Sequence, residues 1–562
     1  MTTHNPPAGA VRDGVGSQRL PVLGTAGARD SGVHRLRSRE GSVLPVALLA
    51  VLVAAVWLML LRLGLAFWRS ELSWRYVAEQ SRVGAPWYYR VAGVWGAMPG
   101  SLLLLTGIVG AVALVALRRI DPADRVGAWF ALGTVSALAV IDLTLASPFG
   151  RLSIPAVEGF GLTPILEHPA MAIHPPLLYL GLACALPVAL IAMRRESSAA
   201  DASDVTRRTR RWLLAVVGLL AGAMALGAAW SYMEQGWGGY WAWDPVENTS
   251  LLVWLAALGA LHALPLGGRL AGVASIAPWS LALLGTTLVR SGIAASIHGF
   301  SEQATVGWCL LGLTAVSTAT MALVVRPRPV RDGEDPSAGY HRRVAVVIVS
   351  AVGLCVLVGT AGPMLADIAG GRHAAVRGKY FSGLVGPLAA IAVPFMAWRL
   401  RRWRGTATVA HIGALVLLVG IAASTFDSSE DVTLPAATTQ HVSGIDVTNL
   451  GLDVVDGARR DTSAVVLHLR VDGNAMSPSL VVYPDRGGRL AEVATVSRPW
   501  RDVQIALVDA GDNGAAIIVV RTRPLVWLLW IGAAIVAFTT VGGALMDRRR
   551  RPADVAVGPA AR

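Results

Sequence analysis

Apolar residues along this chain are grouped into about twelve long runs, separated by short polar segments. A helix needs about 20 consecutive apolar residues to cross the hydrocarbon core of a bilayer, and the runs are close to that length. The pattern predicts spans near residues 43–67, 100–117, 127–147, 175–193, 212–230, 249–265, 276–293, 304–325, 344–362, 382–398, 407–424 and 523–546. It therefore indicates an all-α polytopic membrane protein.

Three segments depart from this pattern. Residues 1–41 are rich in Gly, Pro, Ser and Arg, which predicts a disordered tail, and residues 547–562 form a second polar tail. Residues 425–522 alternate apolar and polar positions between Asp-Gly and Gly-Gly breaks, which is typical of strands. We therefore predict a membrane core over 42–424, a small β-rich domain over 425–522 and a last span over 523–546.

Arginines indicate which side of the membrane each loop occupies. They cluster in the loops after the second, fourth, eighth, tenth and last predicted spans. Cytoplasmic loops carry an excess of basic residues, and these loops share one side if both termini are cytoplasmic. The β-rich domain is then extracytoplasmic. The net charge of +13 is explained by these loops, so we predict no nucleic-acid partner, and a charged fraction of 15% excludes a soluble domain.

The three cysteines, Cys184, Cys309 and Cys355, all lie within predicted spans. The chain has neither a CxxC nor a CxxCH motif. It therefore carries no disulfide-exchange motif and does not hold haem covalently in the usual way.

The most informative segment is the loop 236–248, which reads GWGGYWAWDPVEN and joins the fifth and sixth spans on the outer side. Its aromatic rings and glycines would suit a large planar ligand such as a porphyrin. The predicted platform comprises Trp237, Gly238, Gly239, Tyr240, Trp241, Trp243 and Asp244. An interfacial aromatic belt is the alternative, but it does not explain three tryptophans within seven residues. Asp-Pro-Val-Glu is also a typical helix start, so Asp244 and Glu247 have a capping alternative.

Two pairs of histidines are candidate haem ligands, because neutral imidazole is a common axial ligand of haem iron. His174 and His298 stand at the outer ends of two spans, at the level of the loop 236–248, with two interfacial histidines as the alternative. His262 and His411 each stand roughly 10 Å inside the cytoplasmic end of a span. They suit a b-type haem, with a hydrogen bond to a neighbouring helix as the alternative. Arg290, at the outer end of the seventh span, is a candidate partner for a haem propionate, a helix carbonyl or an acid.

These segments resemble a known family. The loop 236–248 resembles the WWD signature of haem-handling membrane proteins, and we call it the WWD loop. Its flanks are similar to the CcmF-type cytochrome c haem lyases, and the resemblance runs from about residue 43 to 551. The other similar segments are Tyr76-Val-Ala with Pro86-Trp-Tyr-Tyr-Arg90, Trp95 to Leu104, His174-Pro-Pro-Leu-Leu-Tyr179, and Val289 to His298.

The resemblance implies a function in a bacterial plasma membrane, with the active site on the extracytoplasmic side. It implies that His174 and His298 ligate substrate haem delivered by a CcmE-type chaperone. His262 and His411 would ligate a resident haem b that keeps the incoming iron reduced. A CcmH-type partner would present apocytochrome c with reduced CxxCH thiols, which form two thioether bonds with the haem vinyls. A quinol is a further candidate partner.

The chain also departs from the family pattern. Residues 95–101 read WGAMPGS where the pattern has Trp-Gly-x-His-Glu-Gly-Ser, and Tyr240 stands where a Trp is usual. Against the family pattern, we expect this chain to be without the first span and two spans before His411. A haem transporter or exporter, and an electron-transferring b-type membrane cytochrome, are the alternatives. A transporter needs a polar path, and few charged groups within the spans could line one. An electron-transferring b cytochrome would explain His262 and His411 but would not explain the WWD loop.

Overall fold

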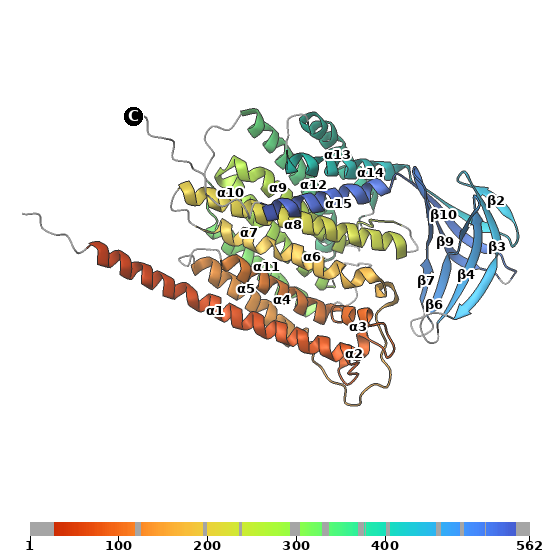
Figure 1. Cartoon of the computed structure of the whole chain (residues 1–562), viewed down its shortest axis with the longest axis horizontal. Coiled ribbons are helices and arrows are strands. Elements are labelled where there is room, and N and C mark those ends of the chain that lie inside the picture. Colours follow the sequence, from red (N-terminus) through yellow and green to blue (C-terminus); the bar gives the residue numbers. More distant parts are fainter. Residues whose placement is uncertain are drawn as a thin grey trace, which may run out of the picture.

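The computed structural model describes residues 27–118, 125–194, 199–234, 239–292, 304–328, 336–368, 376, 378–400, 405–456, 462–483, 488–511 and 513–546. Long helices form a bundle, and a β-rich domain lies at one end of it (Figure 1). We call this end of the bundle the β-domain end, and the other the opposite end.

The described helices are α1 (Gly27–Trp68), α2 (Arg75–Gln80), α3 (Trp87–Gly93), α4 (Met98–Leu117), α5 (Arg125–Thr144), η1 (Pro164–Leu166), η2 (Pro169–Ala172), α6 (His174–Ala183), α7 (Ala185–Ala192), α8 (Ala199–Glu234), α9 (Pro245–Ala263), η3 (Leu264–Leu266), α10 (Gly268–Arg290), α11 (Ala304–Val324), α12 (Pro336–Ile368), α13 (Gly378–Leu400), α14 (Thr406–Ala423), η4 (Ser424–Phe426) and α15 (Trp527–Met546). Within the described ranges, twelve segments are long and apolar enough to cross a membrane, and each overlaps one predicted span. The prediction of a multi-pass membrane protein is confirmed.

Two of the boundaries predicted between the tails, the membrane core, the β-rich domain and the last span differ in the structure. Helix α1 starts at Gly27, within the segment predicted to be a disordered tail. Once a helix has formed over the apolar run, each further residue adds a hydrogen bond at little cost, so 27–41 continue it. The last helix starts at Trp527, because residues 523 and 524 belong to a strand.

The core of the bundle lies among α1, α4, α5, α7, α8, α9 and α10, where leucine, valine and alanine side chains are fully buried. Helices α14 and α15 pack against each other through glycines. A Cβ on Gly532 of α15 would lie 2.3 Å from the backbone nitrogen of Leu417, and one on Gly413 would lie 2.6 Å from the Ile535 side chain. Small residues allow such close approach of membrane helices. This pair carries the β-rich domain, which is inserted between the two helices.

The β-rich domain has two antiparallel sheets that enclose a core of its own. Their strands are β1 (Ser428–Leu434), β2 (Thr439–Val442), β3 (Ile445–Asp456), β4 (Ser463–Val471), β5 (Asn474–Met476), β6 (Ser479–Tyr483), β7 (Gly488–Glu492), β8 (Ala494–Ser497), β9 (Arg501–Ala510) and β10 (Ala516–Pro524). One sheet has the order β1-β10-β9-β8, and the other β2-β3-β4-β6-β7 with β5 paired to β4. The predicted β-rich domain is confirmed, and its strand β9 approaches the end of α8.

Candidate functional site

A cavity of about 200 Å³ lies at the β-domain end of the bundle. It is bounded by the starts of α4, α6 and α9, by the ends of α8 and α10, and by part of the WWD loop. The residues that line it include Trp95, Met98, Ser101, Met171, His174, Tyr179, Gly227, Trp230, Ser231, Tyr240, Trp241, Glu247, Ser250 and Arg290. The cavity combines aromatic walls, one histidine and one buried cation, as a pocket for a porphyrin with acidic side chains requires.

His174 is held on α8 at the wall of this cavity. Its Nδ1 lies 2.9 Å from the carbonyl oxygen of Ala223. Because a carbonyl only accepts, a neutral ring carries its proton on Nδ1 and its lone pair on Nε2. This is the tautomer that binds haem iron through Nε2.

Two tryptophans, Trp230 and Trp241, are among the aromatic residues that line the cavity. Their Nε1–H groups are buried and have no hydrogen-bond partner within the described residues. The same holds for Trp74 and Trp279, which do not line this cavity, so the aromatic rings rather than the N–H groups characterise its wall. The edge of the Trp230 ring faces His174, with ring centroids 6.1 Å apart.

Arg290 places a positive charge in the cavity wall, with 7% of its surface exposed. Its Nη1 donates to Ser101 Oγ at 2.9 Å and to the Met98 carbonyl at 3.4 Å, and its Nη2 reaches the Tyr179 hydroxyl at 3.5 Å. Among the described residues these hydrogen-bond partners are all neutral. A buried cation of this kind favours an anionic ligand group.

Some residues of the WWD loop line the cavity, and others pack against neighbouring helices. Tyr240 and Trp241 line the cavity, and Gly239 is buried beside it. Trp243 instead stacks on Phe381 of α13, with ring centroids 4.7 Å apart, and its φ of 59° lies in the left-handed region. The structure therefore does not bring Trp243 to the cavity, where the sequence places it.

Asp244 and Glu247 form a capping box at the start of α9. Asp244 Oδ1 accepts the Val246 N–H at 2.9 Å, and Glu247 Oε2 accepts the N–H groups of Ala242 and Asp244 at 2.9 and 3.2 Å. The capping alternative for both acids agrees with this geometry. Glu247 reaches the cavity, but its carboxylate is engaged with the loop backbone.

His262 and His411 lie together near the opposite end of the bundle, with ring centroids 6.2 Å apart. The Nδ1 of each ring lies within 2.8 Å of the carbonyl oxygen four residues earlier, Leu258 for His262 and Ala407 for His411. By the same reasoning as for His174, a neutral ring at either position has its lone pair on Nε2. The structure therefore brings the second predicted pair together.

Three predicted site residues are not described by the structure, and one cavity residue was not predicted. Trp237, Gly238 and His298 lie outside the described residues. Trp230 lines the cavity but was not predicted as a site residue, although an aromatic residue just before the WWD loop is a signal for it. His168 stacks on Trp230 at 5.7 Å, and its Nδ1 accepts the Ala170 N–H at 3.1 Å. Burial lowers the pKa of His168, so this ring favours its neutral form.

Comparisons with known proteins identify the family to which the chain is similar. A family model described as cytochrome C assembly protein matches residues 95–294. The cytochrome c-type biogenesis protein CycK of Bradyrhizobium diazoefficiens is 30% identical, over 86% of this chain and 88% of CycK. The probable cytochrome c-type biogenesis protein NrfE of Escherichia coli is 34% identical, over 67% of this chain and 73% of NrfE.

A solved structure of cytochrome c haem lyase CcmF has the same fold, with a TM-score of 0.66 at 21% sequence identity, covering 94% of this chain and 99% of that one. The cavity falls within the part of the chain that the family model matches. On its identity to CycK and NrfE over most of their length, the chain belongs to the family of cytochrome c-type biogenesis proteins.

Proposed function

We propose that this chain is a cytochrome c haem lyase, which receives haem in the cavity at the β-domain end and promotes its attachment to apocytochrome c. The observation that carries the proposal is the cavity itself, whose wall combines aromatic side chains, the buried Arg290 and His174, whose neutral ring has its lone pair on Nε2. The name of the structurally similar CcmF supports the same reaction.

The reaction is an addition of thiols to vinyl groups. For each bond, a cysteine sulfur bonds to one vinyl carbon, the vinyl π bond breaks, and the thiol proton ends on the other vinyl carbon. Two cysteines and two vinyls give two thioether bonds, and the addition consumes no oxidant or reductant. The chain contributes by holding the porphyrin so that its vinyl edge meets the thiols, which lowers the entropic part of the barrier.

The cavity residues divide this work. His174 would bind the iron of the substrate haem through Nε2, with His298 as the second proposed ligand. Arg290 would pair with a propionate, because the groups to which its guanidinium donates hydrogen bonds among the described residues are all neutral. Trp230, Tyr240 and Trp241 would cover the porphyrin faces and edge.

We also propose a resident haem b between His262 and His411. The two ring centroids lie 6.2 Å apart. Each neutral ring has its lone pair on Nε2, and neutral imidazole is a common ligand of haem iron, so these two residues would hold the group. When bound, this group would supply an electron that keeps the substrate iron ferrous.

The proposed setting is a bacterial plasma membrane, with the cavity on the extracytoplasmic side. Exposed arginines that follow helices at the opposite end of the bundle, such as Arg118 after α4 and Arg326 after α11, support a cytoplasmic position for that end. The proposed partners are a CcmE-type haem chaperone, a CcmH-type subunit and apocytochrome c. Each of these would meet the chain at the β-domain end.

The test is complementation of a strain that cannot mature c-type cytochromes. His174→Ala should abolish cytochrome c formation while the purified protein keeps its b-type haem, measured as the pyridine haemochrome. His262→Ala or His411→Ala should remove that b-type haem. His441→Ala, in an exposed pair with Asp446 on the β-rich domain, is the matched control. Normal maturation by the His174→Ala variant would refute the proposed function.

A further inference from the structure

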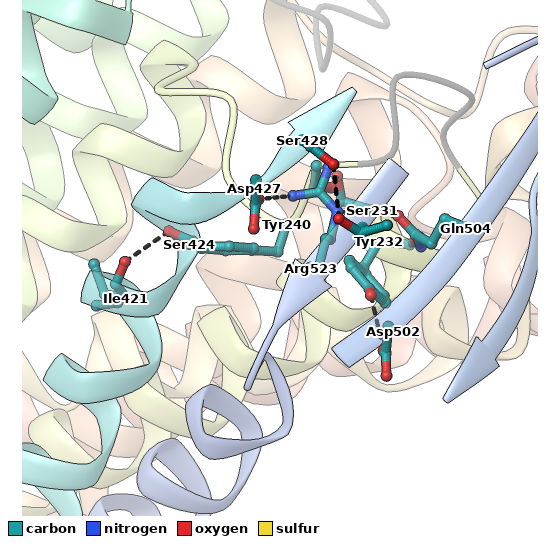
Figure 2. Close-up of polar contacts among 12 residues, drawn as sticks. Ser231, Tyr232, Tyr240, Ile421, Ser424, Asp427, Ser428, Asp502, Gln504 and Arg523 are labelled. Carbon is teal, nitrogen blue, oxygen red and sulfur yellow. Dashed lines mark hydrogen bonds and ion pairs between the residues drawn. The ribbon is translucent and has the colours of Figure 1, made fainter. Parts of the chain in front are cut away.

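A buried polar cluster joins the β-rich domain to the membrane core beside the cavity. We call it the junction and define it as Tyr232, Asp427, Asp502, Gln504 and Arg523. These residues come from the end of α8, the residue after η4, and strands β9 and β10. Figure 2 shows them converging between the sheet and the helix ends, next to Tyr240 and Ser424.

Arg523 is the centre of the junction. Its Nη1 forms an ion pair with the Asp427 carboxylate, and its Nε donates to Gln504 Oε1 at 3.1 Å. Only 8% of its surface is exposed, so the charge depends on these partners. Because a guanidinium is planar and its donors point in fixed directions, the contacts fix β10 relative to the end of η4.

Tyr232 is held by the same sheet at two points. Its hydroxyl donates to Asp502 Oδ2 at 2.8 Å, and its carbonyl accepts from Gln504 Nε2 at 3.0 Å. The preceding residue, Ser231, lines the cavity, and its hydroxyl donates to the Gly239 carbonyl of the WWD loop at 3.0 Å. Strand β9 is therefore linked to the WWD loop through two adjacent residues, because β9 holds Tyr232 and Ser231 holds the loop.

Tyr240 of the WWD loop is tied to η4, three residues before the ion pair. Its hydroxyl lies 2.7 Å from Ser424 Oγ, which itself donates to the Ile421 carbonyl at 2.6 Å. Since the single serine proton is committed to Ile421, Tyr240 is the donor. Burial raises the pKa of Tyr240, so the phenol keeps the proton that it donates. The Trp530 ring of α15 lies beside both tyrosines, and its centroid is 5.7 Å from the ring centroid of Tyr232 and 6.4 Å from that of Tyr240.

We propose that the β-rich domain is a positioning element for the haem cavity, in which Arg523 fixes the sheet on η4 and Ser424 then holds Tyr240 against the cavity. The proposal rests on the proposed lyase function, because it assumes that haem enters this cavity. Tyr240 would contact the substrate directly. Ser424 and Arg523 are positioning residues, since both act through Tyr240.

A double-mutant cycle on Tyr240 and Ser424 tests the proposal. The full-length protein in detergent is titrated with haem, and binding that disappears in a His174→Ala background is taken as cavity binding. Tyr240→Phe and Ser424→Ala should each weaken cavity binding roughly two- to tenfold, as expected for one neutral hydrogen bond. The double variant should be no weaker than the single ones, because both substitutions remove the same bond.

Arg523→Lys and Arg523→Leu extend the test to the sheet. Arg523→Leu should weaken cavity binding at least as much as Ser424→Ala, and Arg523→Lys should restore part of it. The control is Arg489→Ala, which breaks the exposed pair with Asp509 on the same domain and should leave binding unchanged. If Arg523→Leu does not yield folded protein, the conservative Tyr240→Phe and Ser424→Ala variants decide.

The outcomes separate this proposal from the proposed function. If the wild type shows no His174-dependent haem binding, the proposed function fails and the positioning role fails with it. If the wild type binds haem and all Tyr240, Ser424 and Arg523 variants bind equally well, only the positioning role is overturned. Additive losses in the double-mutant cycle would also overturn it, because they would mean that the two hydroxyls act independently.

Discussion

The imidazole of His174 packs directly on the backbone of Gly227, and a Cβ on that glycine would lie 2.6 Å from Cε1 of the ring. The same helix turn accepts the Nδ1 proton through the Ala223 carbonyl. Helix α8 therefore sets both the position and the tautomer of the proposed iron ligand.

Gly227→Ala should consequently displace His174 and lower cytochrome c formation at least tenfold, because a small misplacement of a ligand is costly. The measurement is cytochrome c yield in the complemented strain, with expression checked. Gly222→Ala on the same helix is the matched control, since its Cβ would lie 3.7 Å from its nearest neighbour, an ordinary contact. Equal activity of the two variants would show that α8 does not position the ring.

Arg290 should contribute to haem affinity through its charge and its fork of donors. A hydrogen bond to a charged group is worth about 1.5–3 kcal/mol, so Arg290→Gln should weaken haem binding roughly 10- to 100-fold. Arg290→Lys keeps the charge but not the bidentate geometry, so its haem affinity should lie between those of the wild type and Arg290→Gln. Haem whose propionates are esterified should bind the wild type and Arg290→Gln alike. If the esterified haem still distinguishes the two proteins, Arg290 does not pair with a propionate.

Periodic and composition signals made most of the fold predictable. All twelve spans and the β-rich domain follow from runs of apolar residues and from strand alternation. The pairing of His262 with His411 was predictable only as equal depth, because adjacency of α9 and α14 depends on packing. The stacking of Trp243 on Phe381 could not be predicted, since both the left-handed backbone at Trp243 and its partner on α13 arise from tertiary contacts.

The contacts of the junction could not be predicted from the sequence either. Arg523 and Asp427 stand 96 positions apart in the sequence, and each alone resembles an ordinary polar residue of a β-rich segment. Their burial beside Tyr232 follows from the way the inserted domain packs on the end of α8, and hydropathy does not reveal that contact.

Asp244 should matter as a helix cap rather than through its charge. Asp244→Ala removes the acceptor of the Val246 N–H and should destabilise the protein by about 1 kcal/mol. Asp244→Asn keeps a side-chain oxygen there and should unfold at nearly the wild-type temperature, measured by thermal denaturation in detergent. A loss of cytochrome c formation by Asp244→Asn at unchanged melting temperature would instead assign the carboxylate a role in haem handling.

Stability should depend on pH through Asp427. Burial raises the pKa of this carboxyl from 3.8 to about 6, although Arg523 opposes the shift, and its Oδ1 is buried without a hydrogen-bond partner in the described part of the chain. Between these two values the folded protein binds more protons than the unfolded chain. The contribution of Asp427 to stability is therefore fully present below about pH 4 and is lost as the pH rises through about 6.

Asp427→Asn has no carboxyl to ionise, so its melting temperature relative to the wild type should increase between about pH 5 and about pH 7. The measurement is thermal denaturation of both proteins in detergent across this range. Asp509→Asn, which alters the exposed pair with Arg489, controls for the loss of one acidic residue and should show no such trend. If the wild type instead gains stability relative to Asp427→Asn as the pH rises, the attraction of Arg523 outweighs the cost of burying the charge, and the ion pair itself stabilises the fold.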